Sequence, residues 1–179
     1  MHDTGPDGPP SATDIARYRA NLQGEIDGAA IYEVMAAAET NPALRELYGR
    51  LAEVETSHGG VWRERLEGAG IATGALGPSW RTRILMRIAR RFGPAAVVAS
   101  IAEKESTDQL MYDAQPEATS GMPADERSHA RLLRDLAHGR GLEWGTVARI
   151  EGRHRMSGVN ALRAAVLGAN DGLVSNLSL

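Results

Sequence analysis

Two copies of one four-residue pattern decide the fold: Glu55-Thr56-Ser57-His58 and Glu126-Arg127-Ser128-His129. Residues three apart on a helix share one face, so each copy presents a carboxylate beside an imidazole. Each copy also lies within an apolar stripe of helical spacing, where a bare ionised carboxylate is costly. A duplicated Glu-x-x-His pattern in helical sequence is typical of two metal ions held inside a four-helix bundle.

The sequence around these motifs predicts four long helices. The expected ranges are 13–39, 42–68, 94–115 and 124–138, with Thr13 or Asp14 as the first N-cap and Pro42 at the start of the second helix. A crossover over 69–93 separates the two halves, and its residues 79–92 form a short amphipathic helix with arginines and no acid. The prediction is therefore an all-α protein.

Composition limits the remaining possibilities. The chain of 179 residues lacks cysteine, which excludes disulfides, thiolate zinc sites and iron–sulfur clusters. A net charge of −3 gives no reason to expect nucleic acid as a partner. We expect a disordered tail over 1–12, a bundle domain over 13–140, a basic linker or short helix over 141–158, and a small apolar segment over 159–179.

Six side chains form the predicted metal site. Four carboxylates and two imidazoles match the di-iron or di-manganese pattern of ferritin-like four-helix bundles, and the four negative charges would balance two divalent cations. Glu25 and Glu55 each lie 15 residues from residue 40, so an antiparallel hairpin places them at one level. The full predicted set is Glu25, Glu55, His58, Glu105, Glu126 and His129.

The assignment on the third helix leaves alternatives open. Glu103 lies about 160° around the helix from Glu105, away from the apolar stripe. Asp108, one turn further on, is either an extra ligand or an outer hydrogen-bond acceptor. Tyr32 and Tyr112 either donate hydrogen bonds near the metals or serve only as core. The alternative for the motifs themselves is a solvated helix face that binds no metal.

At these residues the chain resembles rubrerythrin-type ferritin-like proteins. The resemblance covers about residues 14–138 and implies a di-iron centre that reacts with O2 or peroxide, with self-association as a homodimer. The cysteine-bound iron of rubrerythrins proper is absent. Their third helix usually offers two glutamates three apart, whereas here Glu105 is followed by Asp108. A rubrerythrin peroxidase cycle is therefore not implied.

A second resemblance lies near the C-terminus. Residues 162–175, LRAAVLGANDGLVS, are similar to the first transmembrane helix of the vacuolar iron transporter family. That family moves Fe²⁺ or Mn²⁺ across membranes, and the resemblance places Asp171 on the ion path. Residues 159–179 would span about 30 Å as a helix, and the basic residues before them favour a cytoplasmic N-terminal domain. The alternative is a fifth helix packed on the bundle.

Three functional hypotheses follow. The first is a cytoplasmic di-iron domain of a membrane iron or manganese transporter, which binds and oxidises Fe²⁺ or senses or supplies metal for transport. The expected cofactor is two iron ions, with manganese as the alternative. The second is a soluble rubrerythrin-like peroxidase or ferroxidase. The third is a metal-free helical interaction module. For the arginine-rich helix over 79–92, a membrane-surface role and a solvated face that caps the bundle both stay open.

Overall fold

The structure is a computed structural model that describes residues 9–113, 115, 117–118 and 121–138. Every regular element in this part of the chain is a helix, which confirms the all-α prediction. The elements are α1 (Ala12–Ala38), α2 (Pro42–Gly68), α3 (Trp80–Phe92), the 3₁₀ turn η1 (Pro94–Ala96), α4 (Val98–Asp113) and α5 (Met122–Ala137).

Local capping explains where the helices begin. The Ser11 side chain accepts a hydrogen bond from the Asp14 backbone amide, and the Asp14 carboxylate accepts one from the Ser11 amide. The N-cap of α1 is therefore Ser11, and the prediction of Thr13 or Asp14 is wrong because Asp14 is the third residue of a capping box. Pro42 does open α2, and the Asn41 side chain caps it through the Ala43 amide at 2.9 Å.

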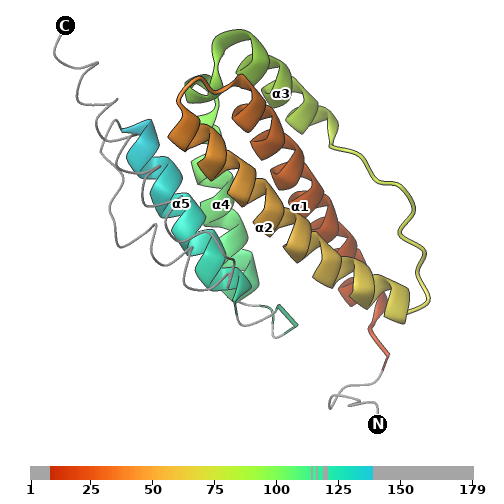
Figure 1. Cartoon of the computed structure of the whole chain (residues 1–179). Coiled ribbons are helices and arrows are strands. Elements are labelled where there is room, and N and C mark those ends of the chain that lie inside the picture. The colour runs from red at the N-terminus through yellow and green to blue at the C-terminus, as the bar shows by residue number, and fades with distance from the viewer. Residues whose placement is uncertain (1–8, 114, 116, 119–120, 139–179) are drawn as a thin grey trace, which may run out of the picture.

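The bundle consists of two antiparallel hairpins, α1–α2 and α4–α5 (Figure 1). The chain leaves α2 at one end, runs back along the bundle through residues 69–79 and forms α3 beside α1. The α1–α2 turn and the α4–α5 turn therefore lie at opposite ends. This is the crossover that the ligand spacing requires.

Two apolar clusters occupy the interior, one toward each end. The cluster near the α1–α2 turn includes Met35, Leu51 and Leu133, and the other is built around Trp62. Trp62 is fully buried between the rings of Tyr18 and Tyr112, with centroid distances of 5.6 and 5.7 Å. Along each long helix, the predicted ligands lie between the residues that belong to one cluster and those that belong to the other. The fold therefore places a polar layer between two apolar ones.

The predicted linker over 141–158 and the apolar segment over 159–179, including Asp171, lie outside the described residues. Among the helices that the structure describes, none combines the length and the apolar character that a bilayer span needs.

Candidate metal centre

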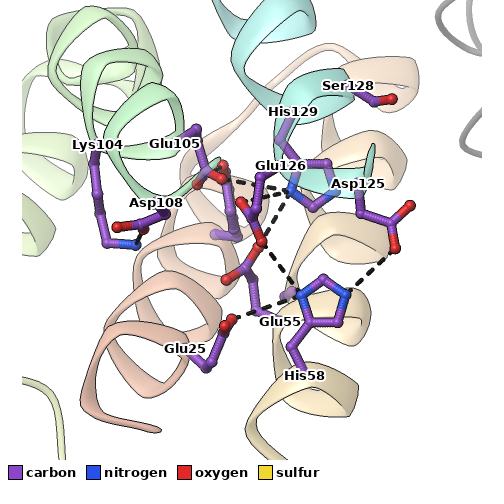
Figure 2. Close-up of polar contacts among 12 residues, drawn as sticks. Glu25, Glu55, His58, Lys104, Glu105, Asp108, Asp125, Glu126, Ser128 and His129 are labelled. Carbon is purple, nitrogen blue, oxygen red and sulfur yellow. Dashed lines mark hydrogen bonds and ion pairs between the residues drawn. The ribbon is translucent and has the colours of Figure 1, made fainter. Parts of the chain in front are cut away.

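All four long helices contribute to one buried polar layer. Glu25 comes from α1, Glu55 and His58 from α2, Glu105 from α4, and Glu126 and His129 from α5. These six side chains belong to residues that are at most 5% exposed. The structure thus brings together every predicted ligand, and Figure 2 shows their side chains pointing toward one another. Their binding of metal stays a prediction.

The six residues form two overlapping groups of four. In each group, ligand atoms from all four members lie within 4.8 Å of one another. Glu55 and Glu126 belong to both groups, so two bound ions would share them. The first group adds Glu25 and His58, and the second adds Glu105 and His129. Each ion would therefore have one imidazole and one carboxylate of its own.

Unsatisfied polar atoms show that this layer fits metal ions. Buried nitrogen and oxygen atoms are normally hydrogen-bonded, because an unpaired one costs free energy. Here seven buried side-chain atoms of the predicted ligands have no hydrogen-bond partner in the described part of the chain: Glu55 Oε1, His58 Nδ1, Glu105 Oε2, both Glu126 oxygens and both His129 nitrogens. All of them except His129 Nε2 make only ion-pair contacts of 3.2 to 3.7 Å within this layer. These are the donor types that iron and manganese take.

Two tyrosines hold the outer carboxylates in a reciprocal arrangement. The Tyr32 hydroxyl on α1 donates to Glu105 on α4 at 2.6 Å, and the Tyr112 hydroxyl on α4 donates to Glu25 on α1. The tyrosines thus act near the site as well as in the core. Each bond fixes a carboxylate that belongs to one ligand group only.

On α4 the structure separates the alternatives that the sequence left open. Glu105 is fully buried at the site, whereas Glu103 is exposed. Asp108 is in neither ligand group, because its carboxylate pairs with the Lys104 ammonium one turn earlier. Burial raises the pKa of Asp108, and Lys104 opposes that rise. The idea of Asp108 as an extra ligand is therefore not supported by its position.

The sequence reasoning missed Asp125. Its carboxylate lies 3.4 Å from His58 Nε2, which leaves Nδ1 of the same ring facing Glu25 and Glu126 (Figure 2). A carboxylate on the far nitrogen is a common way to orient a metal-binding imidazole. The position before Glu55, which corresponds to Asp125 in the motif, is Val54, so the two halves differ here. The acidic pair Asp125-Glu126 was the available signal.

Burial and mutual repulsion disturb the titration of the carboxylates. Burial, followed by repulsion from Glu105, raises the pKa of Glu126 to about 7. Burial and then Glu126, Glu105 and Glu25 raise the pKa of Glu55 well above its usual value. For Glu25 and Glu105 burial acts in the same direction, but hydrogen bonds outweigh it and lower the pKa. The metal-free layer therefore holds protons at neutral pH.

The imidazoles shift the other way from what burial alone would do. Burial lowers the pKa of His58, yet the carboxylates of Asp125, Glu126 and Glu25 raise it to about 12. His129 is shifted upward in the same way by Glu105, Glu126 and Glu55. Both rings are therefore cationic in the metal-free protein at neutral pH. In the absence of metal, these two positive charges partly balance the negative charge of the carboxylates around them.

Metal binding is expected to release at least two protons per chain at pH 7, because His58 and His129 must give up their protons to act as ligands. Calorimetry with Mn²⁺ in two buffers of different ionisation enthalpy measures this number. Affinity should also rise between pH 6 and pH 8. A binding heat that is independent of the buffer would contradict the protonation of His58 and His129.

The same shifts predict an unusual stability profile for the metal-free protein. The pKa of Glu126 rises from an ordinary 4.5 to about 7, so its stabilising effect is complete below pH 4.5 and is lost as the pH rises through 7. The stabilising effect of His58 is complete below pH 6.5 and declines progressively as the pH rises toward 12. Chelator-treated protein should therefore unfold at a lower urea concentration at pH 8 than at pH 6.

Gly28 leaves room for the shared ligand Glu55. A Cβ added at Gly28 would lie 2.5 Å from Glu55 Oε2, so a larger residue must displace this carboxylate. We expect Gly28→Ala to weaken metal binding roughly 10-fold while the helix stays folded. Gly24→Ala is the matched control, because nothing lies within 4 Å of its added Cβ. It should keep metal affinity and stabilise α1 by about 0.5–1 kcal/mol. Equal metal affinities in both variants would refute this role of Gly28.

Comparison with known proteins gives weak relationships to several enzymes of one name. The chain is 39% identical over 68 residues to a 3-demethoxyubiquinol 3-hydroxylase of Coxiella burnetii, which covers 38% of this chain and 32% of that protein. It is 27% identical over 126 residues to the enzyme of the same name in Paraburkholderia phytofirmans, covering 68% of this chain and 59% of that protein. The chain thus spans about a third to three-fifths of these curated relatives. No family model and no solved structure matches it significantly.

Proposed function

We propose that this chain is a ferritin-like domain that binds two iron ions between its four helices and reduces O2 or peroxide there. The observation that carries this proposal is the pair of overlapping ligand groups that share Glu55 and Glu126. Two iron ions in such a site can together supply two electrons to one oxidant. Manganese suits the same ligands and is the alternative metal.

The protein's own residues have distinct parts in this proposal. Glu55 and Glu126 would be shared by both ions, whereas Glu25 and Glu105 would each hold one ion and are oriented by tyrosine hydroxyls. Asp125 orients the His58 ring. The apolar clusters on both sides keep bulk water from the layer, which strengthens its electrostatic interactions.

Anaerobic titration tests the proposal directly. Fe²⁺ should bind to a stoichiometry of about two per chain, and subsequent mixing with O2 or peroxide should oxidise it faster than Fe²⁺ free in the same buffer. Metal-independent thermal stability and no uptake of Fe²⁺ or Mn²⁺ would favour the third hypothesis, a metal-free helical interaction module. Sedimentation of the same samples tests the expected homodimer.

Hydroxylation of a quinol-like aromatic compound is a second candidate function. The two relatives are named 3-demethoxyubiquinol 3-hydroxylases, and inserting an oxygen atom from O2 into a ring C–H bond needs a redox centre and two further electrons. To test this candidate, the iron-loaded chain is mixed with a chemical reductant, O2 and a short-tailed demethoxyquinol, and the products are analysed. A hydroxylated product favours this candidate. Oxidation of Fe²⁺ or consumption of peroxide without product favours a ferroxidase or a rubrerythrin-like peroxidase.

We also propose a link between this bundle and metal transport. It is supported by the resemblance of residues 162–175 to a helix of the vacuolar iron transporter family, and it assigns Asp171 to the ion path. In this arrangement the bundle would lie in the cytoplasm and sense or supply Fe²⁺ or Mn²⁺. Flux of these ions through the gene product in vesicles, compared with its Asp171→Asn variant, tests the link. Equal flux would remove it.

A further inference from the structure

Helix α3 packs on the bundle through one face. Thr82 and Ala89 are buried, and Leu85, Met86 and Ile88 pack against the cluster near the α1–α2 turn. The Asp27 carboxylate on α1 accepts a hydrogen bond of 2.6 Å from the Ser79 amide, so the start of α3 is held in place. The apolar side of the arginine-rich helix therefore does cap the bundle. The opposite side needs a separate explanation.

The opposite side of α3 carries a mixed stripe that we name the outer face: Trp80, Ile84, Arg87 and Arg91. Spacings of four, three and four residues place these side chains in one row along a helix. Trp80 is 64% exposed and Ile84 is 44% exposed, although both are large apolar residues. Phe92, at the end of the helix, is 69% exposed. The packing of the described helices therefore leaves this apolar surface uncovered.

Positive charge surrounds the exposed apolar side chains. The helix contains five arginines and no acid: Arg81, Arg83, Arg87, Arg90 and Arg91. Within the described residues, no ion pair joins any of these arginines to a carboxylate. Arg81 lies over the Trp80 ring at 5.4 Å, and Arg91 lies over the Phe92 ring at 5.2 Å. Each of these two guanidinium groups therefore lies beside an exposed aromatic ring, and no carboxylate of the described residues neutralises its charge.

We propose that the outer face of α3 docks this protein onto the surface of an anionic lipid bilayer. Such a surface offers negative headgroups for the arginines and, just below them, an apolar layer for Trp80 and Ile84. The helix axis would lie in the plane of the headgroups, with the rest of the bundle on the side away from the lipid; Figure 1 shows α3 on the outside of the bundle, beside α1. Tryptophan suits this boundary because its ring is apolar and its N–H is polar.

Charge and chemistry argue against other occupants. A second copy related by twofold symmetry would bring two arginine-rich faces together, with strong repulsion. A nucleic acid offers phosphates but no apolar layer for Ile84. The proposal concerns a different surface from the metal layer and does not depend on metal binding.

Co-sedimentation of the full chain with vesicles tests this proposal. The vesicles contain either phosphatidylcholine alone or phosphatidylcholine with 30% phosphatidylglycerol. The test variants are Arg87→Gln/Arg91→Gln and Trp80→Ala/Ile84→Ala. The control is Arg63→Gln/Arg131→Gln, which removes the same charge from exposed positions of α2 and α5. Far-ultraviolet circular dichroism and the urea midpoint, measured in parallel, verify that each variant keeps its helical bundle.

We expect wild-type chain and control to prefer the anionic vesicles, and high salt to weaken that preference. Each arginine near such a surface contributes roughly fivefold, so the double arginine variant should bind about 25-fold more weakly. The apolar variant should also lose affinity. Any binding contributed by residues 159–179 is common to all variants and cancels in the comparison.

Three results would overturn the proposal. One is equal binding of wild type to neutral and anionic vesicles. Another is an arginine variant that binds anionic vesicles as tightly as the Arg63→Gln/Arg131→Gln control. The third is a loss of affinity for single-stranded RNA in the arginine variant without a change in vesicle binding, which would assign the face to nucleic acid.

Discussion

Replacing Glu55 by alanine is expected to reduce metal uptake from about two ions per chain to none. Glu55 belongs to both ligand groups, so its loss leaves each group with three of four members and removes the bridge. His58 and His129 belong to one group each. His58→Ala and His129→Ala should therefore each retain about one ion. Anaerobic Fe²⁺ titration followed by metal analysis after gel filtration measures all three stoichiometries.

The matched control for this series is Glu103→Ala. Glu103 is a carboxylate two residues from Glu105 on the same helix, but it is exposed. It should bind two ions like the unchanged protein. Full uptake by Glu55→Ala would overturn the shared-ligand arrangement, and loss of both ions in His129→Ala would contradict the division into two groups.

The isosteric variant Glu55→Gln separates metal binding from folding. Repulsion from Glu126, Glu105 and Glu25 contributes to the raised pKa of Glu55. A neutral amide of the same size removes that repulsion, so the metal-free variant should be at least as stable as the metal-free parent at pH 8. Urea unfolding with a chelator present measures this. A large loss of stability would mean that Glu55 serves the fold rather than the metals.

Trp62→Ala should give the largest loss of stability, about 3–5 kcal/mol. The ring is fully buried between Tyr18 and Tyr112 and forms the centre of its apolar cluster. Because Tyr112 donates to Glu25, the cavity should also loosen one ligand and weaken metal binding. Urea unfolding at fixed pH, with and without metal, measures both effects.

Two further tryptophan variants sharpen this prediction. Trp80→Ala is the control, because that ring is 64% exposed, and its stability should change by less than about 0.5 kcal/mol. Trp62→Phe keeps an aromatic ring and removes an indole N–H that has no hydrogen-bond partner among the described residues. It should therefore lose much less stability than Trp62→Ala. Equal losses at positions 62 and 80 would show that this cluster does not support the bundle.

Periodicity and capping residues were sufficient to predict most of the fold. The four long helices lie within a few residues of the expected ranges, because apolar stripes, Pro42 and the Gly93-Pro94 break act locally. The N-cap of α1 was misplaced because Ser11 and Asp14 act as a reciprocal pair, and several neighbouring residues are good caps. The sequence also predicted which helices pair as hairpins. The ligands can lie at matching levels only if a crossover along the bundle joins the two hairpins.

For the candidate site, the sequence by itself determined which carboxylates and imidazoles share a helix face. Spacings of three and four residues have one outcome on any helix, so Glu55 with His58 and Glu126 with His129 could be paired in advance. Contacts between helices depend on how far each helix is rotated and shifted against its neighbours. Only the tertiary structure could therefore decide that Glu55 and Glu126 are shared, that Asp125 contacts His58 and that Asp108 turns to Lys104.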